Sequence, residues 1–180
     1  MNILGALPAG LIGIAEAAKR ALPPVHLWNP DHCGEIDIVI RADGVWMHEG
    51  SPIGRKELVR LFSTVLRLDP DGYHLVTPVE KLRIRVEDAP FRAIACARQG
   101  DDLVFVTDVG DETVAGPDNP IRVEINEDGT PRPYVHVRRG LEARIERAIF
   151  YDLVEAAERN DEGELVLRSG GADFVLGRDT

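Results

Sequence analysis

The spacing of hydrophobic residues changes several times along the first half of the chain. Isoleucine occupies every second position from 36 to 40, a period of two that predicts a half-buried strand. Asp43-Gly44 predicts a tight turn, and residues 45–48 a return strand. Over residues 55–68 the apolar positions recur every three or four residues, which predicts an amphipathic helix. Further strands are expected at 73–77, 81–86, 92–98 and 103–107.

The second half follows a similar order. Residues 121–125 alternate, Asp128-Gly129 supplies a turn, and Tyr134–Val137 forms the return strand. A second helix is expected after Gly140, with its apolar face running from Ile145 onward, and a hairpin at 165–176 closes the chain. His48 and His136, like Phe62 and Phe150, take matching places in the two halves under this alignment.

This repetition predicts an internal duplication. The expected fold is α+β, with two related domains that each contain a mainly antiparallel sheet and one main helix, in the order strand, DG turn, strand, helix, strands. We expect an N-terminal amphipathic helix and linker at 1–24, a first domain at 25–98 and a second at 99–180. Within the first segment, Leu11–Leu22 has helical spacing and is ended by Pro23-Pro24.

Composition narrows the classes of function. The 180 residues carry a formal net charge of −10, which disfavours binding to a nucleic-acid backbone because such binding needs clustered cations. No apolar run is long enough to predict a membrane span. Cys33 and Cys96 lack the spacing of a disulfide framework or a zinc site. We therefore expect a cytoplasmic protein that binds neither nucleic acid nor membrane, with no metal and no cofactor, and with an undetermined capacity to form homo-oligomers.

Residues 28–53 hold the densest group of candidate side chains, including both tryptophans and His32 and His48. Cys33 with a nearby histidine would suit a nucleophile and its base, yet the spacing matches no known catalytic pattern. We therefore predict no catalytic residue and favour a protein that is not an enzyme. A small hydrolase that uses Cys33 or a loop histidine is the alternative.

Basic residues suggest anion binding at three places. Arg55 and Lys56 lie at the N-terminus of the first predicted helix, an end that attracts anions. Lys81, Arg83 and Arg85 alternate along one predicted strand. Between 129 and 147 five arginines face only two glutamates, while the flanking segments are acidic. Such an island would concentrate an anionic ligand, although a solvated helix face with internal ion pairs is the favoured explanation.

A set of short motifs resembles a bacterial family of unknown function. The motifs are Trp28-Asn29-Pro30, Cys33-Gly34 and Ile36-Asp37-Ile38, followed by Asp43-Gly44, Trp46, Gly50, Pro52-Ile53, Tyr73, Thr77-Pro78, Glu80-Lys81 and Asp88-Ala89-Pro90-Phe91. In combination they resemble domain-of-unknown-function family twelve-eighty-five from about Pro23 to Gly177. The resemblance implies a duplicated two-domain fold, a pleckstrin-homology-like second domain, a ligand site at the domain interface and a signalling role. It implies no catalytic residues.

These observations lead to one main hypothesis. The chain is expected to be a non-catalytic ligand-binding or sensor module for a small anionic, nucleotide-like molecule between the domains. Base stacking is assigned to the tryptophans and phosphate contacts to the basic side chains. The predicted binding residues are Trp28, Trp46, Arg55, Lys81, Arg83, Arg138 and Arg139. A protein-interaction scaffold is a further alternative.

Overall fold

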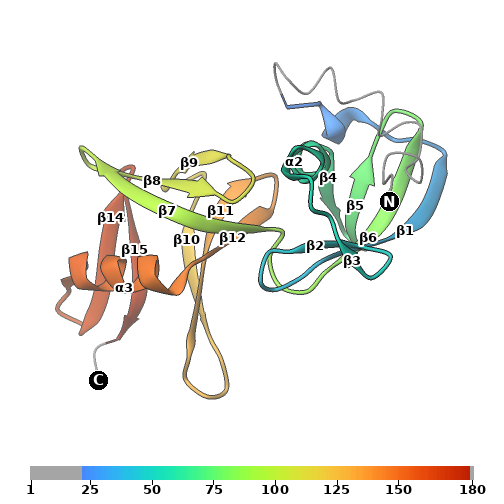
Figure 1. Cartoon of the computed structure of the whole chain (residues 1–180). Coiled ribbons are helices and arrows are strands. Elements are labelled where there is room, and N and C mark those ends of the chain that lie inside the picture. The colour runs from blue at the N-terminus through green and yellow to red at the C-terminus, as the bar shows by residue number, and fades with distance from the viewer. Residues whose placement is uncertain (1–21, 179–180) are drawn as a thin grey trace. The chain divides into compact units, whose positions relative to one another are not determined.

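The computed structural model describes residues 22–178. These residues form two compact units that divide between Glu87 and Asp88. Each unit is built around a six-stranded sheet (Figure 1). The expected helix at Leu11–Leu22 lies almost wholly outside the described residues. Within the described part of the chain, no helix is long and apolar enough to cross a membrane.

Unit 1 contains a short 3-10 helix, six strands and one α-helix. In chain order they are η3 (Val25–Leu27), β1 (His32–Ile40), β2 (Trp46–His48), β3 (Ser51–Pro52), α2 (Lys56–Thr64), β4 (Leu66–Asp69), β5 (Gly72–Val76) and β6 (Glu80–Val86). The sheet order is β3-β2-β1-β6-β5-β4. The central pair β1 and β6 is parallel, and every other pairing in this sheet is antiparallel.

Helix α2 contributes a large aromatic side chain to the core of unit 1. Phe62 is fully buried, and its ring stacks on that of Trp46 with centroids 6.3 Å apart. The helix ends at Thr64, earlier than the expected Leu68. Residues Leu66–Asp69 instead form β4, because they pair with the neighbouring strand β5 across a short turn.

Unit 2 contains a similar sheet and an added C-terminal extension. The sheet strands are β7 (Phe91–Gln99), β8 (Asp102–Thr107), β9 (Glu112–Val114), β10 (Ile121–Ile125), β11 (Pro131–Arg138) and β12 (Leu141–Ile145). Their order is β10-β11-β12-β7-β8-β9, with β12 and β7 parallel. The extension consists of α3 (Arg147–Ala156), β13 (Glu158–Arg159), β14 (Glu164–Ser169) and β15 (Ala172–Arg178), and its strands form a separate three-stranded sheet.

The second α-helix begins at Arg147, later than the sequence suggests. Residues 141–145 form strand β12, in which Leu141, Ala143 and Ile145 are buried and alternate with more exposed neighbours. Alternation with a period of two is the mark of a strand. The apolar residues of this strand, combined with those that follow, also fit a helical spacing. The sequence pattern therefore predicts a helix that starts too early.

The domain boundary also differs from the expected 98/99. Strand β7 pairs with β8 on one side and with β12 on the other, so all of it belongs to the second sheet. The division therefore falls between Glu87 and Asp88. Asp88 itself belongs to unit 2, where Tyr134 donates a 2.6 Å hydrogen bond to its carboxylate.

The two sheets have the same topology, which confirms two similar domains. In each unit the first and sixth strands lie together at the centre as the parallel pair, and the other strands follow outward in the same order on both sides. Strands β1–β6 therefore correspond one by one to β7–β12. The helices do not correspond, because α2 joins the third and fourth strands of its sheet whereas α3 follows the sixth.

This correspondence changes the alignment of the halves. Asp128-Gly129 precedes the fifth strand of its sheet and so matches Asp71-Gly72 rather than Asp43-Gly44. His74 lies opposite Arg83, and His136 lies opposite Glu142 in the matching strand pair. His136 therefore lies in the fifth strand of its sheet, as His74 does, and the expected match with His48, which lies in a second strand, is wrong. Phe62 and Phe150 lie on helices that are not equivalent.

Candidate functional site

A cavity of about 330 Å³ lies on unit 1 over the strands β1, β5 and β6. Its lining consists of Cys33, Gly34, Glu35, Asp71, His74, Lys81 and Arg83. Strand pairing explains how they meet: Cys33 lies opposite Lys81 in the parallel pair β1·β6, and Glu35 lies opposite Arg83. Because side chains alternate along a strand, Lys81 and Arg83 share one face of β6 while buried Leu82 points to the other.

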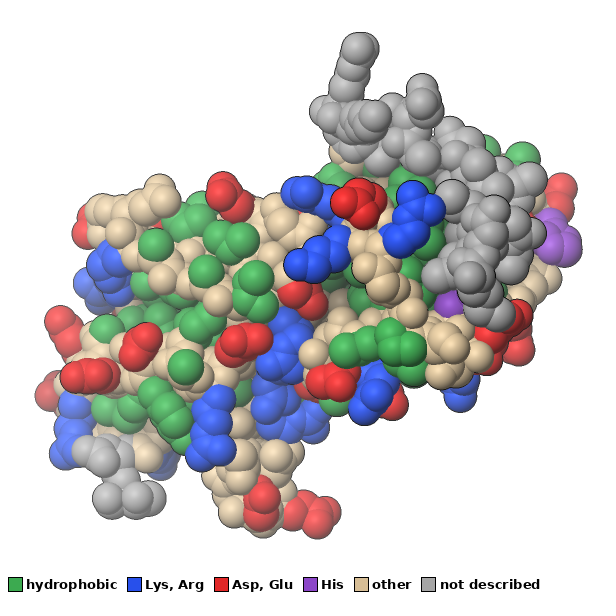
Figure 2. Space-filling view, in the orientation of Figure 1, with side chains coloured by type: hydrophobic (Ala, Val, Ile, Leu, Met, Phe, Trp, Pro, Cys, Tyr) green, Lys and Arg blue, Asp and Glu red, His purple; other side chains and the backbone are tan. Residues whose placement is uncertain are grey.

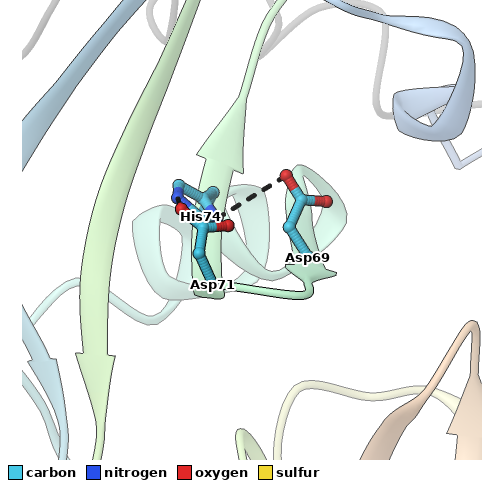
Figure 3. A group of neighbouring side chains, drawn as sticks. All are labelled: Asp69, Asp71 and His74. Carbon is cyan, nitrogen blue, oxygen red and sulfur yellow. Dashed lines mark ion pairs between the residues drawn. The ribbon is translucent and has the colours of Figure 1, made fainter.

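His74 is buried between two carboxylates beside this cavity (Figure 3). Its side chain is only 4% exposed, and its Nδ1 lies 3.0 Å from the carbonyl oxygen of Gly72. The same nitrogen lies 3.8 Å from Asp69, and Nε2 lies 3.5 Å from the exposed Asp71. The turn between β4 and β5 thus places two acids around one imidazole.

Asp69 is the centre of a dense ion-pair network. Arg67 donates two parallel hydrogen bonds to its carboxylate, at 2.7 and 2.9 Å, and Lys81 donates a third at 3.0 Å. The bonds from Arg67, ahead of those from Lys81, hold the pKa of Asp69 below its ordinary range, although partial burial opposes them. The carboxylate is therefore firmly ionised, and one of the two cations at the cavity is partly neutralised.

Asp69, Asp71 and His74 lie close enough together to resemble a metal site, since one ligand atom from each falls within 4.8 Å of the others. The surrounding charges disfavour a cation there. Arg67 occupies both carboxylate oxygens of Asp69, and the ammonium group of Lys81 lies 3.0 Å from one of them. A divalent ion would have to displace these donors and tolerate two nearby positive charges. This group is better suited to orienting Lys81 than to binding metal.

The same arginine also fixes the segment that precedes β1. Nη1 of Arg67 donates hydrogen bonds to the carbonyl oxygens of Val25 and Trp28, at 2.8 and 2.6 Å. Arg67 is only 13% exposed, so these charge-assisted bonds form in a partly desolvated setting where they are stronger than at an open surface. A continuous chain of polar contacts therefore links Lys81, through Asp69 and Arg67, to the backbone of the Trp28 loop.

Two of the seven predicted binding residues, Lys81 and Arg83, lie together in the cavity. Trp46 is 2% exposed and packed on Phe62, so its ring has no free face for a base, and its assignment as a stacking residue is withdrawn. Trp28 is half-buried and contributes its carbonyl to Arg67. Its ring is not among the cavity-lining groups that the structure describes.

Arg55, Arg138 and Arg139 lie elsewhere. Arg55 is exposed at the start of α2 and is not part of the cavity lining. Arg138 forms an ion pair with Asp111, and its guanidinium lies 5.0 Å from the centre of the Phe91 ring. Arg139 is exposed in the turn between β11 and β12. Arg138 and Arg139 both belong to unit 2, and neither is among the residues that line the cavity of unit 1.

The basic island of the second half is largely neutralised by acids from outside it. Arg132 and Arg144 both bind Asp88, which is 10% exposed on its side chain. Arg147 donates a 2.6 Å hydrogen bond to the hydroxyl of Tyr151. Basic and acidic side chains occur on both units on the face that Figure 2 shows. The island is therefore a paired surface, but most of its arginines lie on strands β11 and β12 and bind acids outside it, so the helix face with internal ion pairs is wrong.

The geometry around Cys33 does not assemble a nucleophile and a base. Its Sγ is exposed and lies 3.9 Å from the carbonyl oxygen of Pro30. His74 lines the same cavity, but its two ring nitrogens face Gly72 and Asp71 rather than the thiol. A catalytic pair needs the base within hydrogen-bond reach of the nucleophile. The described contacts thus give no support to the hydrolase alternative.

Sequence reasoning overlooked Asp69, Asp71, His74 and Arg67. Carboxylates are abundant in this acidic chain, so two more in a turn carried no signal by themselves. The available signal was the second Asp-Gly turn at 71–72, followed by a histidine in a predicted strand. That turn matches Asp128-Gly129, and correct alignment of the halves would have drawn attention to the histidine.

Comparisons with known proteins agree on one family. A model described as the N-terminal domain of the domain of unknown function DUF1285 matches residues 23–89, and one for the C-terminal domain of DUF1285 proteins matches residues 90–176. The junction of these matches lies close to the division between the two units. No curated protein matches the chain.

Two solved structures are similar to this chain. A DUF1285 family protein from Silicibacter pomeroyi DSS-3 is 48% identical over 96% of this chain and 97% of its own, with a TM-score of 0.84. A DUF1285 family protein from Shewanella baltica OS155 is 29% identical over 67% of this chain and 92% of its own, with a TM-score of 0.54.

Proposed function

Since the chain belongs to the DUF1285 family, a family of unknown function, we propose from the site itself that unit 1 is a non-catalytic binding module for a small phosphorylated molecule. The observation that carries this proposal is the pair Lys81 and Arg83, which project from one face of β6 into the same cavity. Two cations at this spacing suit the oxygens of a phosphate group.

Arg83 is the better placed of the two to meet a ligand. It is exposed at the cavity, and among the described residues no ion pair or hydrogen bond of its side chain is present. Lys81 already binds Asp69, so it would offer the ligand an ammonium group whose charge is partly neutralised. A planar guanidinium can bind two phosphate oxygens at once. We therefore assign Arg83 the main phosphate contact and Lys81 the supporting one.

The acids at the cavity indicate what the rest of the ligand carries. Glu35 and Asp71 are carboxylates, which accept hydrogen bonds and repel a second phosphate. Hydroxyl groups of a sugar would satisfy them. The volume of about 330 Å³ is at the lower end of small-molecule sites, which span roughly 300–1,000 Å³. A sugar phosphate or a mononucleotide combines these properties, in keeping with the nucleotide-like ligand expected from the sequence.

A sensor role is supported by the polar chain behind the cavity. An anion that attracts Lys81 weakens its bond to Asp69, and Asp69 in turn holds the arginine that fixes the backbone of Val25 and Trp28. Occupancy of the cavity would thereby alter how firmly this segment is held. Such a change is a physical route from ligand binding to a signal.

A thermal-shift screen of the full chain tests the proposal. Sugar phosphates and mononucleotides are the probes, and a ligand at about 100 times its Kd stabilises the folded state by ~2.7 kcal/mol. Arg83→Gln should abolish the shift. Arg85→Gln is the matched control, because Arg85 lies on the same strand, pairs with Asp37 and does not line the cavity. No stabilisation by any probe, or an equal loss in both variants, would contradict the proposal.

A further inference from the structure

A second, larger cavity lies entirely within unit 2. It is a groove of about 700 Å³ between the end of the β7–β8 hairpin and the C-terminal extension. The extension contributes the end of α3, which lies against β14 (Figure 1), together with β13 and the strand pair β14–β15. Because this extension follows the sixth strand, the matching position in unit 1 has no such structure, and the groove is specific to unit 2.

One wall of the groove is apolar. Val166 and Val175 lie directly opposite each other in the antiparallel pair β14·β15, so their side chains share a face. Val175 is 47% exposed and Val166 is half-buried. Adjacent exposed valines in a concave surface provide a place where an aliphatic group can be removed from water, worth about 25 cal/mol for each Å² buried.

The rest of the groove carries both signs of charge in equal number: Arg98, Arg159 and Arg168 against Asp101, Glu158 and Asp173. Arg168 and Asp173 bind each other at 2.7 Å, with side chains 77% and 51% exposed. An ion pair so exposed contributes at most about 1 kcal/mol, so a ligand can exchange with it at little cost.

Arg98 is held more weakly than Arg168. Its Nη1 lies 3.5 Å from the carbonyl oxygen of Arg168, the limit of a hydrogen bond. Asp101 follows it across the hairpin turn and faces the same groove. A guanidinium and a carboxylate thus lie on one side, and the valine pair lies on the other.

From these features we infer that the groove binds a short zwitterionic peptide with aliphatic side chains. Its C-terminal carboxylate pairs with Arg98, its terminal ammonium group pairs with the acids of the groove, and its side chains cover Val166 and Val175. Arg98 and Asp101 have opposite charges, so a ligand with a single charge would match only one of them. This site is independent of the phosphate site proposed for unit 1.

Isothermal titration of the full chain with trileucine tests this inference. Trileucine should bind, and the N-acetylated, C-amidated form, which lacks both charges, should not. Arg98→Gln should weaken binding at least ~10-fold. Arg178→Gln is the matched control, because Arg178 lies on β15 and pairs with Glu164 but does not line the groove. Arg83→Gln should leave trileucine binding unchanged, which separates this site from the one in unit 1.

Three results would overturn the inference. They are no binding of trileucine at ~10 mM, equal binding of the capped peptide, and unchanged binding by the Arg98 variant. Decanoate provides a fourth arm, since it offers one negative charge and an aliphatic chain. Decanoate binding as tight as that of trileucine would replace the peptide with an anionic amphiphile as the occupant.

Discussion

His74 and His136 lie on the corresponding fifth strands of two similar sheets, and their surroundings differ. The imidazole of His74 lies between Asp69 and Asp71 and borders an open cavity. The imidazole of His136 accepts a 2.9 Å hydrogen bond from the backbone N–H of Gly140, and the amide of Asn119 lies 3.3 Å from its other nitrogen. The shared strand order therefore does not create the candidate site, which depends on side chains that only unit 1 carries.

The residues opposite the two histidines show the same contrast. Arg83 faces His74 and lies exposed at the cavity. Glu142 faces His136 and accepts hydrogen bonds from Nε and Nη2 of Arg122, at 2.7 and 2.6 Å. In unit 2 this position is part of a closed surface network. In unit 1 it is available to a ligand.

Removal of Asp69 should have the largest effect. Asp69→Ala leaves Arg67 and Lys81 without their shared partner in a partly buried setting, and we expect a loss of ~3 kcal/mol in the free energy of unfolding. Urea denaturation measures it. The comparison variant Asp173→Ala breaks an exposed pair and should cost below ~1 kcal/mol. Equal costs for the two variants would show that the network around His74 has no special strength.

Asn119→Ala should have the next largest effect. The Asn119 side chain donates to the carbonyl oxygens of His136 and Val137, at 3.1 and 2.9 Å, besides its contact with the imidazole. Losing these bonds should cost ~2 kcal/mol, again measured by urea denaturation. The variant should gain no response to phosphorylated ligands, because His136 faces Glu142, an acid that Arg122 already binds, where His74 faces the cation Arg83. Such a response would break the contrast between the two histidines.

The pH dependence of stability should report on Asp69. A lowered pKa in the folded state means that this carboxylate stabilises the protein above the ordinary value of 3.8, and the contribution is lost as pH falls through the lowered folded value. Wild type should therefore lose stability in acid more steeply than Asp69→Asn. Parallel urea titrations between about pH 6 and pH 2 measure the two slopes. Identical slopes would show that ionised Asp69 does not stabilise the folded state.

Substitution of the residues opposite the histidines should give the smallest effects. Glu142→Gln removes the charge that both ends of Arg122 bind, and should cost ~1 kcal/mol or less because the pair is partly exposed. Arg83→Gln should change stability by less than ~0.5 kcal/mol, since it removes no described bond. Thermal unfolding without ligand measures both. A large loss on changing Arg83 would mean that this side chain is structural.

Much of the fold could be predicted from local patterns. The alternation at 36–40 predicted β1, and the Asp-Gly turns predicted hairpins that the structure contains. The segment 141–145 was misassigned because its apolar residues fit a strand and also extend a helical pattern. The parallel pairing of β1 with β6 joins strands far apart in sequence, and no local pattern indicates it. Without that pairing the two halves were aligned on the wrong Asp-Gly turn.

The site was predictable only in part, for a related reason. Lys81 and Arg83 alternate with apolar residues on one strand, so their shared face followed from the sequence. Trp46 looked like a binding residue because tryptophan is common in both cores and sites, and only packing against Phe62 decides between them. A tight turn brings Asp69, Asp71 and His74 together. Their relation to the cavity depends on the pairing of β5 with β6, which the local sequence does not indicate.

NMR can show whether unit 1 but not unit 2 offers a ligand site beside the histidine of its fifth strand. Backbone amide shifts of the full chain are followed during titration with a sugar phosphate or mononucleotide that the thermal-shift screen identifies. We expect amide shifts to change at residues 33–35, 71–74 and 81–83, and not at Asn119, His136 or Gly140. Shifts at the second group without the first, or no shift in either, would contradict this expectation.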